Sequence, residues 1–313
     1  MAMRRIVLLA GGVGGAKLAH GLAQVLAPGQ LSVIVNTGDD FWHYGLRVCP
    51  DLDTVMYTLS GLVDPVNGWG VAGDTIAMLT ALQRYGEEPW FRLGDQDVAT
   101  HLLRTQALRG GSRLTEVTAR LSQALGVSTQ ILPMTDDEVG TIIDTVEYGE
   151  LAFQEYFVRY RWQPTVKAIR FAGIETARPT SEVEAAIVEA DAIVLGPSNP
   201  WLSIAPILAV PGLRALIEAQ PVPRLALSPI VAGRALKGPA AKLMAELGWD
   251  VSASAVARYY GDLINGFVYD VRDAGADVKT KNAVTFDTIM KTDADRAALA
   301  SAMLEWIESG VVV

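Results

Sequence analysis

Short apolar runs alternate with amphipathic stretches along most of the chain. Each such run, with its glycine- or proline-containing loop and the helical periodicity after it, predicts a strand–helix unit. Repeated units of this kind build a parallel sheet with helices on both faces, so we expect an α/β fold with a mostly parallel sheet. The predicted strands are 6–10, 31–35, 128–132, 141–146, 151–158, 166–171, 192–195, 224–227, 266–271 and 283–288.

Two parts of the chain depart from strict alternation. A probable hairpin turn at 147–150 joins two of the strands. The stretch of about 55–127 is mostly helical, and three aspartates precede predicted helices as candidate N-caps. We therefore expect a single α/β domain over 1–313, with about 55–127 as a helical insertion that covers the site. The helices of this stretch are predicted at 54–59, 75–85, 98–109 and 115–125, with Asp51, Asp74 and Asp95 as the caps.

Composition narrows the class of protein. Half of the residues are hydrophobic and 19% are charged, which suits a well-packed globular chain. The net charge of −9 leaves no basic stripe for nucleic acid. The single cysteine, Cys49, argues against a disulfide framework and a thiolate zinc site. No apolar stretch approaches a membrane span, and the first apolar run ends in a glycine loop instead of a cleavage site, so we expect a cytoplasmic protein.

A glycine-rich loop, 11–15 (GGVGG), joins the first predicted strand to a helix over 16–26. This arrangement aims backbone N–H groups and the positive end of the helix at an anion. A dinucleotide fingerprint needs glycine where Lys17 stands, and a P-loop needs Gly-Lys-Ser/Thr, so the loop is of neither type. We expect a phosphate-binding loop; the alternative is tight strand–helix packing alone.

The segment 36–54 brings four carboxylates together within a short stretch of the chain. It follows the apolar run 31–35, at the carboxyl end of a predicted strand, where ligands bind in open α/β sheets. Its carboxylates repel one another unless a cation or hydrogen-bond donors compensate them. The alternative is a solvated acidic turn in which one aspartate caps the next helix. The four carboxylates are Asp39, Asp40, Asp51 and Asp53.

Two later loops also follow predicted strands. Each alone has the composition of an ordinary turn, but strand ends of one parallel sheet meet at the same rim, so the loops can converge with the glycine loop. The first offers compact hydrogen-bonding groups and the second offers cations. These side chains are Ser198 and Asn199, then Arg234 and Lys237.

Six motifs occur together and in a fixed order: 11–17 (GGVGGAK), 36–40 (NTGDD), 50–54 (PDLDT), 93–101 (LGDQDVATH), 196–200 (GPSNP) and 228–231 (SPIV). This combination resembles the 2-phospho-L-lactate transferase family of coenzyme F-420 biosynthesis, which includes bacterial phosphoenolpyruvate transferases. The resemblance runs from about residue 4 to the carboxyl terminus. It implies a Rossmann-like fold with an inserted helical region, and the use of magnesium.

The resemblance also implies a reaction. A phospholactyl or phosphoenolpyruvyl group would pass from a guanosine-diphosphate-linked donor to the ribityl hydroxyl of the deazaflavin 7,8-didemethyl-8-hydroxy-5-deazariboflavin, and GMP would be released. The donor acid stays open among phospholactate, phosphoenolpyruvate and 3-phosphoglycerate. The oligomeric state is left open, with a homodimer as the candidate.

Roles follow from position in the family motifs and from the chemistry required. Asp53 and Arg92 match the positions that contact the deazaflavin, and some members carry lysine in place of Arg92. Some members also have Thr-Pro where this chain has Gly15-Ala16. We expect Asp40 and Asp53 to bind magnesium, since hard oxygen ligands suit that ion, although Asp53 could instead accept the hydroxyl proton as a catalytic base. The expected donor-binding residues are Gly11, Gly12, Gly14, Gly15, Lys17, Asn36, Ser198 and Asn199; the candidates for stacking on the deazaflavin are Trp42, Trp69 and Trp90.

Two other classes of protein fit the sequence less well. A non-catalytic nucleotide-sugar-binding regulatory protein of related fold would share the glycine loop, but it gives no reason for the motifs 50–54 and 196–200 together. A nicotinamide-dependent oxidoreductase is disfavoured because the glycine spacing does not fit.

Overall fold

A seven-stranded parallel sheet forms the centre of the computed structural model, which describes residues 5–310. Every neighbouring pair of its strands is parallel, which confirms the expected α/β class. In spatial order the strands are β14 (Ala283–Phe286), β13 (Gly266–Asp270), β10 (Arg224–Leu227), β9 (Ala192–Leu195), β1 (Ile6–Ala10), β2 (Leu31–Val35) and β5 (Gln130–Pro133).

The order of the strands fixes where loops meet. The chain runs outward from β1 through β2 to β5, then returns to the other side of β1 and continues through β9, β10, β13 and β14. The order therefore reverses between β1 and β9. The loops that leave these two strands diverge at such a point and leave a crevice, which is where open α/β sheets bind ligands.

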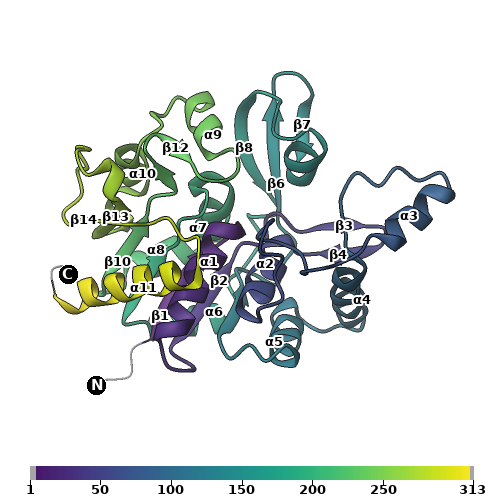
Figure 1. The fold of residues 1–313 in the computed structure, drawn as a ribbon, viewed down its shortest axis with the longest axis horizontal. Coiled ribbons are helices and arrows are strands. Elements are labelled where there is room, and N and C mark those ends of the chain that lie inside the picture. Colours follow the sequence, from purple (N-terminus) through teal and green to yellow (C-terminus); the bar gives the residue numbers. More distant parts are fainter. Residues whose placement is uncertain (1–4, 311–313) are drawn as a thin grey trace.

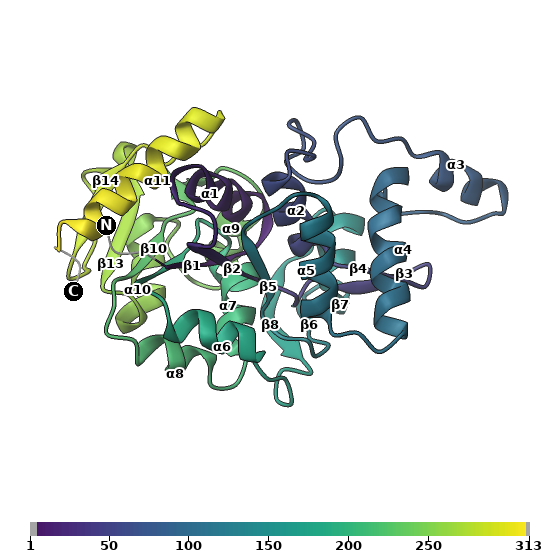
Figure 2. The same cartoon turned by 90° about the horizontal axis from the view of Figure 1, so that it is seen from below.

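Both faces of the sheet are covered because the strand residues alternate between two cores. Within β1, Val7 and Leu9 belong to one hydrophobic cluster, and Ile6, Leu8 and Ala10 belong to the other. Figure 2 shows α1 and α11 on one side of the sheet and α6 and α8 on the other. The helices that contribute to the Ile6 side are α1 (Gly12–Val25), α2 (Pro50–Leu59), α5 (Leu114–Ala124) and α11 (Asp293–Glu308); those that contribute to the Val7 side are α6 (Ser181–Val188), α7 (Ala205–Ala209), α8 (Leu213–Glu218), α9 (Ala240–Glu246) and α10 (Ala253–Tyr260).

Between α2 and β5 the chain forms three helices: α3 (Ala77–Arg84), α4 (Asp95–Arg109) and α5. The first of them projects away from the rest of the molecule (Figure 1), and Leu79 is its one buried residue. A short antiparallel hairpin, β3 (Phe41–His43) and β4 (Leu46–Val48), lies within the acidic segment and packs along α4.

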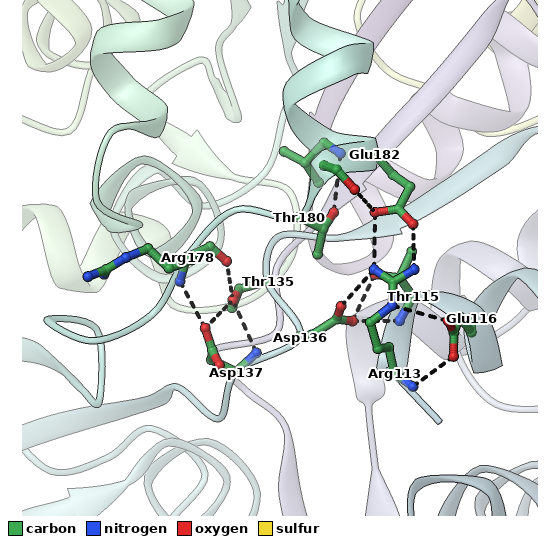
Figure 3. A network of polar contacts seen from close by, with 11 residues as sticks. Arg113, Thr115, Glu116, Thr135, Asp136, Asp137, Arg178, Thr180 and Glu182 are labelled. Atoms are coloured by element: carbon green, nitrogen blue, oxygen red, sulfur yellow. Dashed lines mark hydrogen bonds and ion pairs between the residues drawn. The ribbon is translucent and has the colours of Figure 1, made fainter. Parts of the chain in front are cut away.

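Polar contacts attach α5 to the main sheet (Figure 3). The Arg113 guanidinium bonds to Glu116, to Asp136 in the loop after β5, and to Glu182 in α6. Asp136 also accepts from the backbone N–H of Thr115 at 2.7 Å, so it caps α5 from outside the helix. Because these exposed pairs share partners, the network fixes the position of α5 better than a single surface ion pair would.

A second, antiparallel sheet has the order β7–β6–β8. The predicted hairpin between 141 and 158 forms as β6 (Gly140–Thr145) and β7 (Gly149–Ala152), but a helical turn follows over Glu155–Arg159. Placing the strand 166–171 among the parallel strands was wrong, since β8 (Val166–Ala172) pairs with β6 antiparallel. An apolar run predicts a strand but not its partner.

The helical region between β9 and β10 is interrupted. A helical turn over Pro200–Ile204 leads into α7, and α8 starts only at Leu213. Pro211 cannot donate a helical hydrogen bond, and Gly212 has a φ of 86°, so the break follows from these two residues. The remaining elements are β11 (Ile230–Val231), β12 (Arg234–Ala235) and short 3-10 turns at Gly261–Leu263 and Val271–Asp273.

Candidate functional site

The loops after β1 and β9 are hydrogen-bonded to each other at the point where the strand order of the sheet reverses. The Ser198 hydroxyl accepts from the N–H of Gly11 at 3.1 Å and donates to the Gly11 carbonyl at 2.8 Å. Ser198 is buried. The two motifs therefore converge, as the sequence predicted. Ser198 fixes the glycine loop by bonding to both the N–H and the carbonyl of Gly11.

Close packing accounts for three glycines of the loop. A Cβ at Gly14 would lie 2.5 Å from the carbonyl oxygen of Pro197, and one at Gly15 would lie 2.6 Å from the Ser198 hydroxyl. A Cβ at Gly11 would lie 2.6 Å from the Asp51 carboxylate. Since backbone and buried atoms stand in these places, the glycines are needed to bring α1 against the neighbouring loop, whatever anion binds there.

Asp51 reaches across to the start of α1. Its Oδ1 accepts from the N–H of Gly12 at 2.8 Å, and its Oδ2 accepts from the side-chain amide of Asn36 at 3.0 Å. The expectation that Asp51 caps its own helix was wrong: Cys49 is at the N-cap of α2 and Asp51 lies in the first turn. The N–H of Gly12 is thus occupied by a carboxylate, whereas Val13 and Gly14 lie in the first turn, where N–H groups lack an intrahelical acceptor.

Asn36 and Asn199 are held by the protein itself. The Asn36 side chain is fully buried and accepts from the N–H of Gly38 at 2.8 Å while it donates to Asp51. The Asn199 oxygen accepts from the backbone N–H groups of Trp201 and Leu202 and caps the turn after β9. Both amides fix loop conformation.

Two lysines stand beside the first turn of α1 without an acidic partner among residues 5–310. Lys17 donates to the Met290 carbonyl at 2.8 Å, and Lys237 donates to the Asn67 carbonyl at 2.7 Å. Burial lowers the pKa of Lys17, and the charges of Arg296 and Lys237 lower it further. We call Lys17 and Lys237 the lysine pair; together they form a region of uncompensated positive charge.

Asp40 is a buried carboxylate whose oxygens accept no hydrogen bond from a nitrogen or oxygen donor within the described chain, although the Cys49 thiol is close enough to act as a weak donor. Its side chain is fully buried, and the nearest cationic atom is Nη2 of Arg47, 3.7 Å from Oδ2. Burial raises the pKa of Asp40 to about 7, although Arg47 opposes the shift. Burial, and then the charge of Asp51, likewise raise the pKa of Asp39 well above its usual range. A bound cation would relieve both effects.

Asp53 is buried in α2 and paired with a side chain that the sequence-based site did not include. Arg104 in α4 donates from Nη1 to Oδ2 of Asp53 at 3.0 Å and from Nη2 to Oδ1. His101 Nδ1 lies 3.6 Å from Oδ2. Asp53, Asp97 and His101 form a group whose candidate metal-ligand atoms lie within 4.8 Å of one another, with the Arg104 guanidinium already among them. The helical spacing of 97, 101 and 104 was the signal that could have found these residues.

Arg92 is exposed and lines an open pocket beside α4, together with Trp69 and Asp97. Trp42 is placed differently: its ring lies near the guanidinium groups of Arg47 and Arg109, and its indole N–H donates to Glu138. Trp90 packs against Phe41, His43 and Phe91. Of the three tryptophans singled out in the sequence, Trp69 is the one that lines this pocket.

Residues 6–312 match the family model described as 2-phospho-L-lactate transferase CofD. The chain belongs to this family. It is 43% identical to a phosphoenolpyruvate transferase of Kitasatospora aureofaciens, with 98% of this chain and 99% of that protein covered. It is 45% identical to proteins of the same name in Streptomyces griseus, covering 97% of this chain and 98% of that one, and in Mycobacterium tuberculosis, covering 82% and 83%.

Solved structures support the fold of this CofD-family transferase. A crystal structure of a UPF0052-family protein from Bacillus halodurans has a TM-score of 0.58 and 16% identity, and the match covers 98% of this chain and 99% of that one. At this identity the likeness concerns architecture. Within residues 5–310, no helix combines the length and apolar character required to cross a membrane.

Proposed function

We propose that this CofD-family transferase moves a phosphoenolpyruvyl group from a guanosine-diphosphate-linked donor to the ribityl hydroxyl of the deazaflavin 7,8-didemethyl-8-hydroxy-5-deazariboflavin, and releases GMP. Three relatives at 43–45% identity are named phosphoenolpyruvate transferase, which favours this acid over phospholactate. The family description retains phospholactate as the alternative.

The observation that carries the proposal is the position of Asn67 between two different half-sites. Its carbonyl accepts from Lys237 of the lysine pair, and Asn67 also lines the pocket that contains Arg92 and Trp69. The proposed anion site and the pocket lined by Trp69 would therefore share one wall. A transferase that joins a phosphorylated donor to a ring-bearing acceptor needs this adjacency.

The donor half lies at the start of α1. The lysine pair supplies charge, and the first-turn N–H groups of Val13 and Gly14 point along the positive end of the helix. Most of the expected donor set would act indirectly, by holding the loops in place. Their polar groups are bonded within the protein, or their lack of a side chain allows close packing. These residues are Gly11, Gly12, Gly15, Asn36, Ser198 and Asn199.

The acceptor half lies in the loops 64–76 and 92–94, beside the start of α4. Arg92 offers charge and hydrogen bonds to the ribityl chain or the ring carbonyls, and Trp69 offers a face for stacking. Asp53 stands deeper, on α2 where it meets α4. The loops of the insertion, with the start of α4, would thus form the acceptor half of the site.

Magnesium fits the residues present, because Asp40 has two buried carboxylate oxygens to which no nitrogen or oxygen of the described residues donates a hydrogen bond. Asp40 would be a ligand, and Asp53 could add a second through the lone pairs that Arg104 leaves. When bound, the ion would neutralise charge on the phosphates during transfer.

In the reaction, the acceptor hydroxyl oxygen forms a bond to the phosphorus that carries the enolpyruvyl ester. The bond from that phosphorus to the bridging oxygen breaks, GMP leaves with the bond electrons, and the hydroxyl proton is released. The chain's part is to hold the two substrates in line and to stabilise negative charge, which is most of what phosphoryl transfer requires. Asp53 serves either as a metal ligand or as the acceptor of that proton.

The test is to incubate the protein with deazaflavin, the guanylylated donor and magnesium, and to measure GMP together with the mass of the deazaflavin product. We expect one GMP per product molecule. Arg92→Ala should weaken deazaflavin binding more than binding of a guanosine diphosphate analogue. Binding of the nucleotide without any turnover would contradict the proposal and would favour a non-catalytic regulatory protein.

A further inference from the structure

Helix α4 directs three ionisable side chains toward Asp53. Asp97, His101 and Arg104 are spaced four and three residues apart, which places them on one face of the helix. His101 and Arg104 are each 1% exposed. Burying a guanidinium and an imidazole on one face is costly unless each polar atom finds a partner, so the contacts of this face decide what it does.

The contacts form a chain that begins at Asp53. Arg104 donates to both carboxylate oxygens, and its Nη1 also lies 3.3 Å from His101 Nδ1. A guanidinium can only donate, so the nitrogen of His101 that faces it is the unprotonated one. The proton of His101 is thereby assigned to Nε2, which lies 3.4 Å from Oδ1 of Asp97 without a hydrogen bond of good geometry.

The chain ends at the acceptor pocket. Asp97 accepts from the Tyr57 hydroxyl at 2.8 Å and lines the same pocket as Arg92 and Trp69. The buried carboxylate of Asp53 is therefore connected, through Arg104 and His101, to a wall that a bound acceptor would touch.

Stability alone gives a weak reason for this arrangement. A buried ion pair is often no more stabilising than well-packed apolar side chains of similar volume. The planar fork of arginine does fix the orientation of a carboxylate, because two parallel hydrogen bonds define its plane. Asp53 then keeps one lone pair on each oxygen for the reacting groups.

From these contacts we infer that Arg104 and His101 are positioning residues of the transferase. Arg104 fixes the plane of the Asp53 carboxylate, and His101 holds Arg104 relative to Asp97. Neither side chain touches the substrates. The inference rests on the proposed function, since it concerns the geometry of the same site.

The first experiment compares Arg104→Lys with Arg109→Lys as a matched control. Arg109 lies on the same helix and donates to the Gly45 carbonyl near the surface. A lysine at 104 keeps the charge but contacts one point, so kcat should fall about tenfold to a hundredfold while KM for the donor stays within about twofold. The control should keep the kcat of the unmodified protein. A kcat for Arg104→Lys within about twofold of the control would overturn the inference.

The second experiment compares two substitutions of similar size at one position. His101→Asn places an amide oxygen near the former Nδ1, where it can still accept from Arg104, whereas His101→Gln places its amide near the former Nε2. We expect His101→Asn to retain several times more kcat than His101→Gln at equal thermal midpoints. A purely structural role would make both activities follow the folded fraction. This pair of variants tests the positioning roles even if Arg104→Lys does not fold.

The outcomes separate the two proposals. An unmodified protein that makes no GMP would remove the proposed function and this inference with it. An active unmodified protein whose Arg104 and His101 variants keep full kcat would remove only the positioning roles.

Discussion

Asp74 and Asp95 cap each other's helices. The Asp74 carboxylate accepts from the N–H groups of Gln96 and Asp97 at the start of α4, at 2.9 and 3.0 Å. The Asp95 carboxylate accepts from the N–H groups of Ala77 and Met78 at the start of α3. Each aspartate thus satisfies the helix that follows the other, so the two helix starts, and Arg92 between them in the sequence, are held as one unit.

Asp74→Ala should lower the free energy of unfolding by about 1–2 kcal/mol, because it leaves the first N–H groups of α4 without acceptors. It should also raise KM for the deazaflavin more than KM for the donor, since Arg92 and Asp97 lose their common support. The measurements are a thermal melt and steady-state kinetics with each substrate varied in turn. Asp277→Ala is the control, because its carboxylate lies at the surface, where it contacts Lys279. Equal rises in both KM values would contradict the local effect.

This exchange shows what sequence patterns do and do not determine. Both aspartates were correctly chosen as caps from residue type, but each was assigned to the helix directly after it, which is wrong. Capping needs only an oxygen within reach of an N–H group, and the chain can bring that oxygen from 22 residues away. By contrast, strands such as 6–10 and 192–195 were predicted with their observed bounds, because a fully buried parallel strand is an uninterrupted apolar run.

The candidate site was likewise predicted only in part from the sequence. Motif order and strand ends predicted that the loops holding Gly11 and Ser198 meet, and they do. The partner of Asp53 was not predicted, because Arg104 lies 51 residues away on a helix whose orientation depends on tertiary packing. A period of three and four residues on a helix shows which side chains share a face, but not what that face meets.

Lys237→Ala should weaken donor binding about tenfold and leave deazaflavin binding unchanged, because the lysine pair supplies charge to the donor half only. The affinity that remains should depend less on salt than that of the unmodified protein, since one cation has been removed. Titration with a guanosine diphosphate analogue at two ionic strengths measures both effects. Arg234→Ala, an exposed cation of the same loop, serves as the control. An unchanged affinity for Lys237→Ala would remove this residue from the donor half.

The raised pKa of Asp40 predicts how stability changes with pH. A carboxyl whose pKa is about 7 when folded and about 4 when unfolded binds its proton more tightly in the folded state. Its contribution is therefore complete below pH 4 and is lost as the pH rises through 7. Asp51, with a pKa raised by burial to about 6, acts in the same direction. Without divalent cations, the melting temperature should fall between pH 5.5 and 8.

A substitution and an added cation separate the contribution of Asp40 from those of Asp39 and Asp51. Asp40→Asn should flatten part of the pH dependence, which amounts to the order of a few kcal/mol at most, and Asp39 and Asp51 should account for the remainder. Magnesium at pH 8 should restore the melting temperature of the unmodified protein, since a cation replaces the proton, and should have less effect on the variant. Melts at three pH values with chelator or magnesium provide the comparison. A melting temperature that does not change with pH would show that Asp40 is ionised at no cost.

Asp51→Asn and Asp53→Asn should fail in different steps. An asparagine at 51 has one acceptor oxygen for two donors, so its amide must face either the Gly12 N–H or the Asn36 amide. The unsatisfied contact should cost about 1–3 kcal/mol and should displace the start of α1, which raises KM for the donor. At 53, the buried Arg104 loses the charge of its partner. This variant should therefore melt at a lower temperature and also lose on the order of a hundredfold in kcat.

Both variants are destabilised, so stability alone does not distinguish them. The comparison depends on kinetics at a temperature well below both midpoints with saturating magnesium. Asp277→Asn supplies the baseline for an exposed carboxylate. If Asp53→Asn keeps the turnover of the baseline variant, the buried carboxylate serves the fold and takes no part in the transfer.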